Sequence, residues 1–331
     1  MIEKLYDAPE IFRIYVPLPE NPLKMLNSYV IKTKEGNLLI DTGFCRNECM
    51  EGLQQGIEEL EISLKNTRIF ITHLHSDHSG LVPWLLETEP MKVYMGKEDY
   101  NYLNRDLGSE HWSVLEQRFL EEGFPEDVML RLRDTNRART FAPPEKFEAE
   151  LLEDGAVLEI GEYHFQCIKT PGHTPGHMCL YLIEEKILFS GDHVLFDITP
   201  NITSWDGVKD SLADYLNSLD KIVTYDVKKT FPGHRGEFKT LYERVAELKQ
   251  HHRERLQSIF DSIQIRGKAN AYDVASDLKW NMRGTLWEDF PDNQKWFAVG
   301  ETLSHLDYRE NRGKIEKIQD GKKVRYQVRS L

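Results

Sequence analysis

Short apolar runs separated by turn residues fill most of the chain up to Phe231, and such runs are typical of β-strands. The expected strands share an apolar core and flanking turn residues; they are 12–16, 28–33, 37–40, 68–72, 93–95, 164–169, 177–183, 186–190 and a last one that ends at Phe231. Residues from about 46 to 60 have the pattern of a helix. This mixture of strands and helices predicts an α/β fold.

The segment from about residue 98 to residue 147 departs from this pattern. It is helical and aromatic, with Tyr100, Trp112, Phe119 and Phe124 among its large side chains, and it contains no expected strand. We therefore interpret it as an insertion into the α/β fold. Its aromatic side chains indicate either packing within a core or a cap over a site.

The pattern changes again after His234. The expected elements are helices at about 239–263, 271–279 and 295–310, then strands at 314–319 and 322–328 around an Asp320-Gly321 turn. Three helices followed by a hairpin predict a small winged-helix domain. The expected division is an α/β domain at 1–240, which contains the insertion, and a linking helix with a winged helix at 241–331.

Composition is that of a globular protein, because 40% of the 331 residues are hydrophobic and 29% are charged. No apolar run approaches the roughly 20 residues of a membrane span, so no membrane partner is expected. The N-terminal residues lack the pattern of a secretory signal, and four cysteines are too few for a disulfide scaffold. A cytoplasmic location is therefore expected.

Charge is distributed unevenly along the chain. The net charge of −13 argues against a surface that binds a polyanion over its whole extent. From Arg309 onward, however, there are eight Lys or Arg residues and three acidic ones, a local balance of +5. This basic end makes RNA a candidate partner.

The densest group of metal-ligand residues is in the stretch 72–80, directly after a buried strand. His73, His75, Asp77 and His78 lie so close in sequence that they cannot all point one way on a strand or a helix. On a loop at a strand end they can surround two metal ions. Zinc binds imidazole nitrogen and carboxylate oxygen, and a catalytic zinc keeps one position open for water.

Three later residues extend this group. His173, Asp192 and His234 each lie beside a glycine just after an apolar strand, in the contexts Thr-Pro-Gly-His, Ser-Gly-Asp and Phe-Pro-Gly-His. In a layered α/β fold, strand ends at one edge converge on one cleft. The sequence therefore predicts that all seven side chains line the same cleft.

Together these motifs resemble those of the metallo-β-lactamase superfamily. HxHxDH, followed by His, Asp and His in these contexts, is the superfamily signature, and Asp41-Thr42-Gly43 is similar to its first motif. The resemblance covers about residues 10–238 and implies a four-layer αββα sandwich, in which Asp41 supports the ligand loop. It also implies a binuclear site, since no ligand position is missing. The implied ligands are His73, His75 and His173 for one ion, and Asp77, His78 and His234 for the other, with Asp192 as the bridge.

The implied pair of ions indicates the chemistry. Two divalent ions lower the pKa of a bridging water, give hydroxide near neutral pH and polarise the carbonyl or phosphoryl oxygen under attack. Asp77 or Asp192 is expected to orient the hydroxide and handle the proton, so both are candidate catalytic residues. Zinc is the first choice for the metal, and iron or manganese would accept the same ligands.

Three functions are compatible with these features. The C-terminal segment, including 305–308, looks like that of the β-lactamase-like protein 2 group, and residues 170–177 are similar to those of glyoxalase II-like hydrolases. The first hypothesis, favoured by the acidic main domain, is a hydrolase of a small ester, thioester or lactone. The second is a metal-dependent single-strand endoribonuclease with the hairpin at 314–329 guiding RNA, and the third is a DNA-binding regulator. A β-lactamase and a sulfur dioxygenase are disfavoured, and a homodimer is expected by analogy only.

Other histidines and cysteines have weaker claims to the site. His177 repeats the Pro-Gly-His pattern one turn late and is expected to support the site or the fold. His193 is expected to face either the substrate or, as a loop residue, the solvent. Cys45 and Cys49 are expected to be structural thiols rather than a soft-metal pair. His251-His252 is expected on a solvated or interdomain face of the linking helix.

Overall fold

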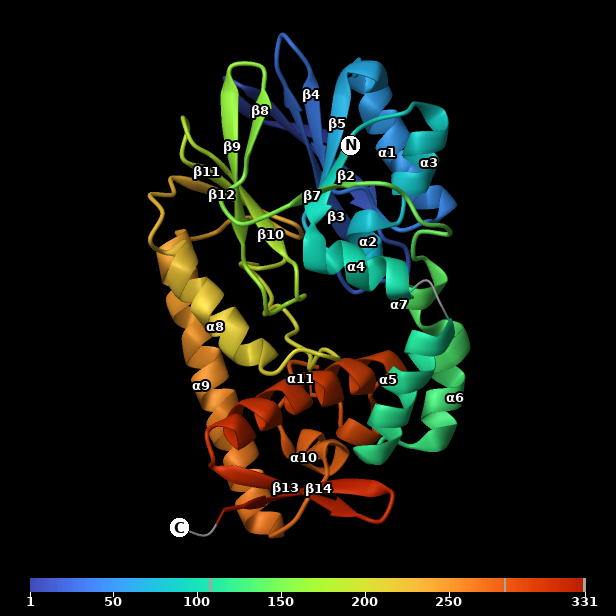
Figure 1. Cartoon of the computed structure of the whole chain (residues 1–331), viewed down its shortest axis with the longest axis vertical. Helices are drawn as coiled ribbons and strands as arrows, with labels where there is room; N and C mark the ends of the chain where they lie inside the picture. The colour runs from blue at the N-terminus through green and yellow to red at the C-terminus, as the bar shows by residue number, and fades with distance from the viewer. Residues whose placement is uncertain (107–108, 283, 330–331) are drawn as a thin grey trace. The chain divides into compact units, whose positions relative to one another are not determined.

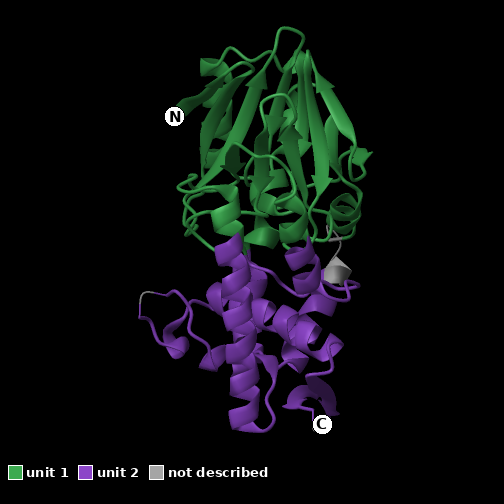
Figure 2. Ribbon diagram, turned by 90° about the vertical axis from the view of Figure 1, so that its left-hand side faces the viewer, with its two compact units in different colours: residues 1–107, 137–200, 218–245 green, residues 108–136, 201–217, 246–331 purple. Residues whose placement is uncertain are grey.

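The computed structural model of the chain describes residues 1–106, 109–282 and 284–329, which form two compact units (Figure 2). Unit 1 comprises residues 1–107, 137–200 and 218–245, and unit 2 comprises residues 108–136, 201–217 and 246–331. The α/β part of the chain is therefore unit 1. Unit 2 combines the C-terminal region with two segments from the middle of the chain, including much of the expected insertion.

A mixed seven-stranded sheet forms one half of unit 1 (Figure 1). Its strands neighbour one another in chain order: β1 (Ile2–Asp7), β2 (Glu10–Pro17), β3 (Met25–Lys32), β4 (Asn37–Ile40), β5 (Thr67–Ile71), β6 (Val93–Gly96) and β7 (Glu150–Leu152). The first four are antiparallel, and β4 to β7 are parallel. Parallel neighbours need a crossover, and α1 (Asn47–Glu59) and α3 (Val82–Thr88) supply it on the outer face of the sheet.

A five-stranded sheet forms the other half of unit 1. Its order is β12 (Lys229–Pro232), β11 (Ile187–Gly191), β10 (Met178–Leu182), β9 (Tyr163–Lys169) and β8 (Val157–Ile160). Tyr29 and Phe70 of the first sheet share one buried cluster with Phe165, Leu180 and Phe189 of the second. The two sheets therefore enclose a common core, and the α/β sandwich predicted from the sequence is confirmed.

Helix α1 shows how the sequence determines this packing. Its buried side chains include Cys49 and Leu53, one helical turn apart, which form one apolar stripe toward the sheet. A Cβ at Gly56 would lie 2.6 Å from Cγ2 of Ile14 on β2, so this glycine lets the helix lie close to the strand. The buried Cys49 thiol donates to the carbonyl of Pro17 at 2.9 Å, as expected of a structural thiol.

Unit 2 has a core of its own. Its elements are α5 (Ser109–Glu121), α6 (Glu126–Thr135), α10 (Ala271–Asp277), α11 (Asp292–Asn311), most of α9 (Leu241–Arg266), and a hairpin of β13 (Ile315–Asp320) and β14 (Lys323–Val328). Phe119 of α5 is buried with Ile259 of α9, Val299 of α11 and Tyr326 of β14. Phe119 and Phe124 of the expected insertion thus belong to a packed core. Among the described residues, no helix is long and apolar enough to cross a membrane.

Several elements were not expected from the sequence. The strands β1, β7 and β8 are short edge or near-edge strands with exposed residues, so their apolar pattern is weak. Helix α8 (Ser211–Ile222) carries buried Leu212, Tyr215, Leu219 and Ile222 at helical spacing, and no element was predicted for these residues from the sequence.

Candidate metal centre

The seven residues predicted as metal ligands all lie in unit 1, at the ends of strands. His73 and His75 follow β5, and α2 (Ser76–Ser79) carries Asp77 and His78. The other three follow β9, β11 and β12; they are His173, Asp192 and His234. Both sheets therefore contribute to one group of side chains.

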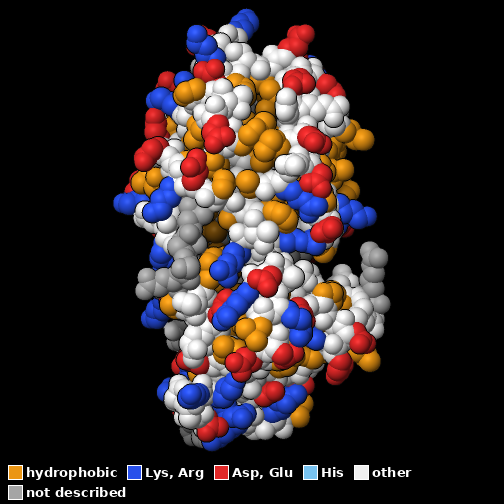
Figure 3. Space-filling model, turned by 90° about the vertical axis from the view of Figure 1, so that its right-hand side faces the viewer, with side chains coloured by type: hydrophobic (Ala, Val, Ile, Leu, Met, Phe, Trp, Pro, Cys, Tyr) orange, Lys and Arg blue, Asp and Glu red, His pale blue; other side chains and the backbone are white. Residues whose placement is uncertain are grey.

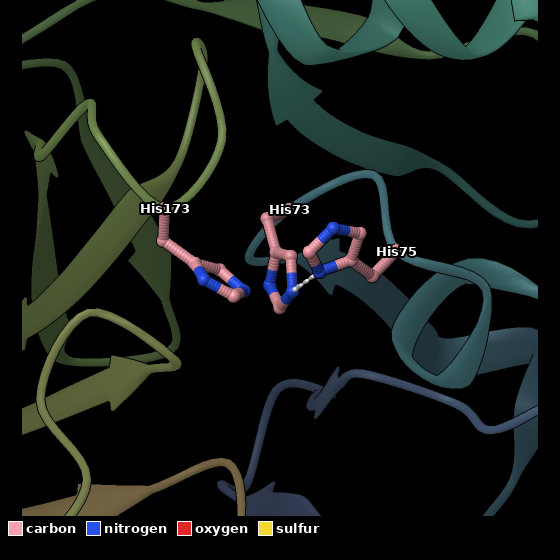
Figure 4. A group of neighbouring side chains, drawn as sticks. All are labelled: His73, His75 and His173. Carbon is pink, nitrogen blue, oxygen red and sulfur yellow. Dashed lines mark hydrogen bonds between the residues drawn. The ribbon is translucent and has the colours of Figure 1, made fainter. Parts of the chain in front are cut away.

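Three overlapping sets of these side chains have ligand atoms within 4.8 Å of one another. The sets are His73, His75 and His173; His73, His78 and Asp192; and Asp77, His78 and His234. Figure 4 shows the rings of the first set turned toward one another, with His173 approaching from a different loop. Nε2 of His73 lies 3.0 Å from Nδ1 of His75.

The carboxylate of Asp192 lies between the two ends of this group. Its Oδ1 is 3.6 Å from Nε2 of His78, and its Oδ2 is 3.5 Å from Nε2 of His234 and 3.8 Å from Nε2 of His173. Nε2 of His234 is also 3.4 Å from Oδ2 of Asp77. Asp192 can therefore reach ligands of both implied ions.

The donor set fits divalent cations. His73, His78 and His234 are fully buried, and Nε2 of His78 faces Nε2 of His234 at 3.3 Å. Oδ1 of Asp192 is buried without a hydrogen-bond partner within the described chain. Ring nitrogens and carboxylate oxygens crowded in this way are the ligands of zinc, iron and manganese.

Burial and neighbouring charges shift the pKa values of these histidines in two directions. Burial and the surrounding histidines hold the pKa of His73 well below 6.5, and burial with His173 lowers the pKa of His75 to about 3. Both are neutral at pH 7, the form that binds metal. Burial opposes the charged form of His78, but Asp41, Asp192 and Asp77 outweigh it and raise its pKa to about 10. A metal ion at His78 must therefore displace a proton.

Glycines beside the ligands permit their close approach. A Cβ at Gly233 would lie 2.5 Å from Oδ1 of Asp192 and 2.9 Å from Cε1 of His78. Gly191 has a φ of +48°, and a Cβ there would meet Nε2 of His177 at 2.7 Å. The glycines of the Ser-Gly-Asp and Phe-Pro-Gly-His motifs thus have a physical reason.

Neither of the two remaining histidines near the centre belongs to a ligand set. Nε2 of His177 accepts the backbone N–H of Asp192 at 3.2 Å, and its Nδ1 lies 2.9 Å from Oγ1 of Thr170. His177 therefore contacts Asp192 without itself belonging to a ligand set. His193 is fully buried, with its ring centroid 6.0 Å from that of His177. The alternative that His193 is a solvent-exposed loop residue is wrong, because its side chain is fully buried.

Sequence reasoning missed one buried carboxylate beside the centre. Asp99 lies at the start of α4 (Lys97–Asp106) and accepts hydrogen bonds from the N–H of Leu74, the hydroxyl of Thr174 and the N–H of Gly176. Burial raises its pKa to about 7, although these three donors oppose the shift. In sequence, Asp99 stands at the edge of the helical insertion, without a motif to mark it.

Comparison with known proteins agrees with this arrangement. The model of the metallo-beta-lactamase superfamily matches residues 22–234, more than half of the chain. The chain therefore belongs to the metallo-beta-lactamase superfamily. With the histidine and aspartate sets described above, it is a metal-dependent hydrolase of that superfamily.

The similarity extends over nearly the whole chain in some relatives. A beta-lactamase-like protein 2 homolog of Caenorhabditis elegans is 28% identical over 85% of this chain and 81% of its own length. An atrochrysone carboxyl ACP thioesterase of Aspergillus fumigatus is 27% identical over 88% of this chain and 78% of its own length. The crystal structure of a metallo-beta-lactamase family protein from Thermus thermophilus superposes with a TM-score of 0.81, at 27% identity, over 96% of this chain and 98% of the other.

Proposed function

We propose that the chain is a binuclear hydrolase that cleaves a small ester, thioester or lactone, with a thioester as the first choice. The observation that carries the proposal is the position of Asp192, whose carboxylate approaches Nε2 of His78 and His234 in one half of the ligand group and Nε2 of His173 in the other. We assign His73, His75 and His173 to one ion. Asp77, His78 and His234 are assigned to the other, with Asp192 as the bridge and zinc as the first metal to test.

The chemistry at this centre combines what metal ions supply with what the chain supplies. A pair of divalent ions lowers the pKa of water and polarises a carbonyl oxygen. Asp77, whose side chain is 13% exposed, and Asp192 are placed to orient that water and to accept its proton. Asp41 holds Nδ1 of His78, so that Nε2 faces the centre.

The thioester preference comes from the relatives and from the leaving group. Relatives from Aspergillus fumigatus and Emericella nidulans are both named as atrochrysone carboxyl ACP thioesterases. A thiol has a pKa of about 8.5, so it departs as thiolate with little help from an acid. A leaving group of this kind does not require a protonated carboxyl group in the site.

The test is release of thiol from a panel of acyl thioesters by zinc-loaded protein. The panel should include simple acyl thioesters and an acylated pantetheine, with a lactone and an ester for comparison. Asp192→Ala, purified and loaded identically, is the control for contaminating hydrolases. Thiol release by the wild type alone supports the proposal, and equal rates with both proteins would refute it.

We further infer that the C-terminal elements form a winged helix that serves for packing. That fold has three helices followed by a hairpin, and the elements here follow this order: α9, α10, α11 and the β13–β14 hairpin. Ala269, between α9 and α10, pairs with Tyr326 and adds a short third strand position to the hairpin. A DNA-reading domain of this type inserts its recognition helix into the major groove. The corresponding helix here would be α11.

Helix α11 is covered within unit 2. All residues from 298 to 306 are buried. The hydroxyl of Ser304 donates to the carbonyl of Ile202 at 2.5 Å, and Phe119 of α5 stacks on Trp296 with ring centroids 3.8 Å apart. Because segment 201–217 and α5 already cover it, α11 is not available to a nucleic-acid groove.

Three basic side chains of the hairpin also have partners within unit 2. Lys317 lies 3.3 Å from the buried Glu122, Arg325 pairs with Asp320 at 2.9 Å, and Lys323 donates to the carbonyl of Leu120. On the face drawn in Figure 3, Lys and Arg side chains alternate with Asp and Glu instead of forming a continuous basic patch. These contacts favour the small-molecule hydrolase over the endoribonuclease.

A further inference from the structure

The metal centre depends on the spacing between two loops that belong to different sheets. His73 and His75 follow a strand of the seven-stranded sheet, whereas His173 follows a strand of the five-stranded sheet. Zinc–nitrogen bonds are about 2.0–2.1 Å long, so an error of a few tenths of an ångström between the loops would weaken binding. A hydrophobic core alone does not fix loops to that precision.

Asp99 joins these two loops through a single carboxylate. Its Oδ2 accepts the N–H of Leu74, between His73 and His75, at 2.9 Å. The same oxygen accepts the hydroxyl of Thr174, next to His173, at 2.6 Å. Its Oδ1 accepts the N–H of Gly176 from the same loop. All three donors lie within three residues of a proposed ligand.

The backbone around Asp99 is shaped to allow this contact. A Cβ at Gly176 would lie 2.3 Å from the backbone nitrogen of Asp99, and a Cβ at Gly96 would lie 2.2 Å from the carbonyl oxygen of Gly176. Real Cβ atoms do not approach backbone atoms so closely, so both positions require glycine. The start of α4 and the loop carrying His173 are thus in direct backbone contact.

We propose that Asp99 is a positioning residue for the metal centre, which sets the distance between the His73–His75 pair and His173. The proposal rests on the proposed metal centre but not on the identity of the substrate. Asp99 acts through the backbone of Leu74 and through the residues that follow His173. Outer partners of this kind typically change metal affinity by 10–100-fold.

A purely structural role for Asp99 is the competing explanation, and the chain offers a matched control for it. Glu122 in unit 2 is also a buried carboxylate, 1% exposed against 0% for Asp99. It accepts the hydroxyl of Tyr326 at 2.8 Å and lies 3.3 Å from Nζ of Lys317. Asp99→Asn and Glu122→Gln each replace a buried carboxyl group by an amide, but only the first is near the ligands.

The experiment is titration of metal-free protein with Co²⁺, followed by the visible absorption of the bound ion, with thermal unfolding of each metal-free variant alongside. We expect Asp99→Asn and Glu122→Gln to lower the unfolding temperature of metal-free protein, and only Asp99→Asn to weaken Co²⁺ binding by about 10–100-fold. Thr174→Val removes one donor and leaves the carboxylate, so it should weaken binding by a smaller factor.

The measured Co²⁺ affinities distinguish a positioning role for Asp99 from a purely structural one. Wild-type Co²⁺ affinity in Asp99→Asn would overturn the positioning role, because the loops would then be spaced correctly without the carboxylate. If Asp99→Asn does not fold, the Thr174→Val variant decides, and unchanged affinity there overturns the role. A wild-type protein that binds no Co²⁺ would instead overturn the proposed metal centre itself, and the inference with it.

Discussion

Nδ1 of His78 lies 2.7 Å from Oδ2 of Asp41, and this contact determines which ring nitrogen of His78 faces the metal centre. The same carboxylate accepts the N–H and the hydroxyl of Thr72, at 2.9 and 2.8 Å. Oγ1 of Thr72 in turn lies 2.9 Å from Nδ1 of His73. Asp41 therefore contacts His78, a proposed ligand of one ion, directly. It reaches His73, a proposed ligand of the other ion, through Thr72.

Asp41→Asn should weaken metal binding at both positions. The Asp41 carboxylate accepts three hydrogen bonds, from the N–H of Thr72, the hydroxyl of Thr72 and Nδ1 of His78. An amide cannot accept all three, because one of its oxygens is replaced by an NH₂ donor. We expect affinity to fall by about 10–100-fold, with a parallel loss of activity. Metal content after dialysis against a fixed free zinc concentration measures this. Wild-type content in the variant would contradict the role of Asp41.

Asp192→Ala should lose one ion equivalent and nearly all turnover. Its carboxylate approaches Nε2 of His78, His173 and His234, so both halves of the ligand group lose a donor. We expect a loss above about 100-fold, since even outer partners of ligands cost 10–100-fold. Metal analysis and thioester turnover of the same preparation check it. Two tightly bound ions in the variant would refute the bridging assignment.

The sequence marks the side chains that the structure brings together, but it does not mark Asp99, which is proposed to position them. His173, Asp192 and His234 stand beside glycines at strand ends, and the structure shows why, since a Cβ at Gly233 would collide with Asp192. Asp99 has no such mark, because its role depends on a contact between two sheets. That contact exists only in three dimensions.

The same limit applies to unit 2. Helical spacing predicted the long helix that carries His252, but not the direction in which this side chain points. Of the two expected positions, a solvated face or an interdomain face, the solvated one is wrong for His252, which is fully buried on α9 against His305 of α11. Periodicity identifies an element, whereas its exposed face depends on segments far away in sequence, here 201–217 and α5.

Chelation should abolish activity and leave the fold intact. The buried cluster between the sheets is made of apolar side chains such as Tyr29, Phe70 and Leu180, and it includes none of the proposed ligands. Metal-free protein should therefore keep its far-ultraviolet circular dichroism and unfold cooperatively. Its stability should fall by about 3 kcal/mol relative to protein with metal at 100 times the Kd. Loss of the circular dichroism signal at room temperature would contradict this.

A buried histidine pair should make unit 2 sensitive to acid. Nδ1 of His305 donates to the carbonyl of Glu301 at 2.7 Å, so its Nε2 accepts from Nδ1 of His252 at 3.0 Å. Burial lowers the pKa of His305 from 6.5 to about 4 and holds that of His252 well below 6.5. Both rings are neutral in the fold, and the unfolded chain binds the extra protons.

The stability that these rings contribute is complete above pH 6.5 and is lost as the pH falls toward 4. For His305 alone the shift corresponds to about 3 kcal/mol. In His305→Gln, which keeps a neutral donor and acceptor, urea unfolding should depend less on pH between 7 and 5 than in the wild type. The control is His164→Gln, a half-exposed histidine paired with Glu184. Equal pH slopes in wild type and His305→Gln would refute the prediction.

Helix α11, the expected recognition helix, is covered by other segments of unit 2. We therefore expect that the basic hairpin beside it does not bind RNA as part of the function. Lys314 and Lys322 are exposed, and their replacement should not disturb the core, whereas Tyr326 on the same hairpin is fully buried. Lys314→Glu with Lys322→Glu should leave thioester turnover within about twofold of wild type, because surface charges of this kind contribute little to stability. Single-stranded RNA should bind both proteins equally weakly at physiological salt. RNA binding that weakens steeply with salt, and that the double variant loses, would return the endoribonuclease to first place.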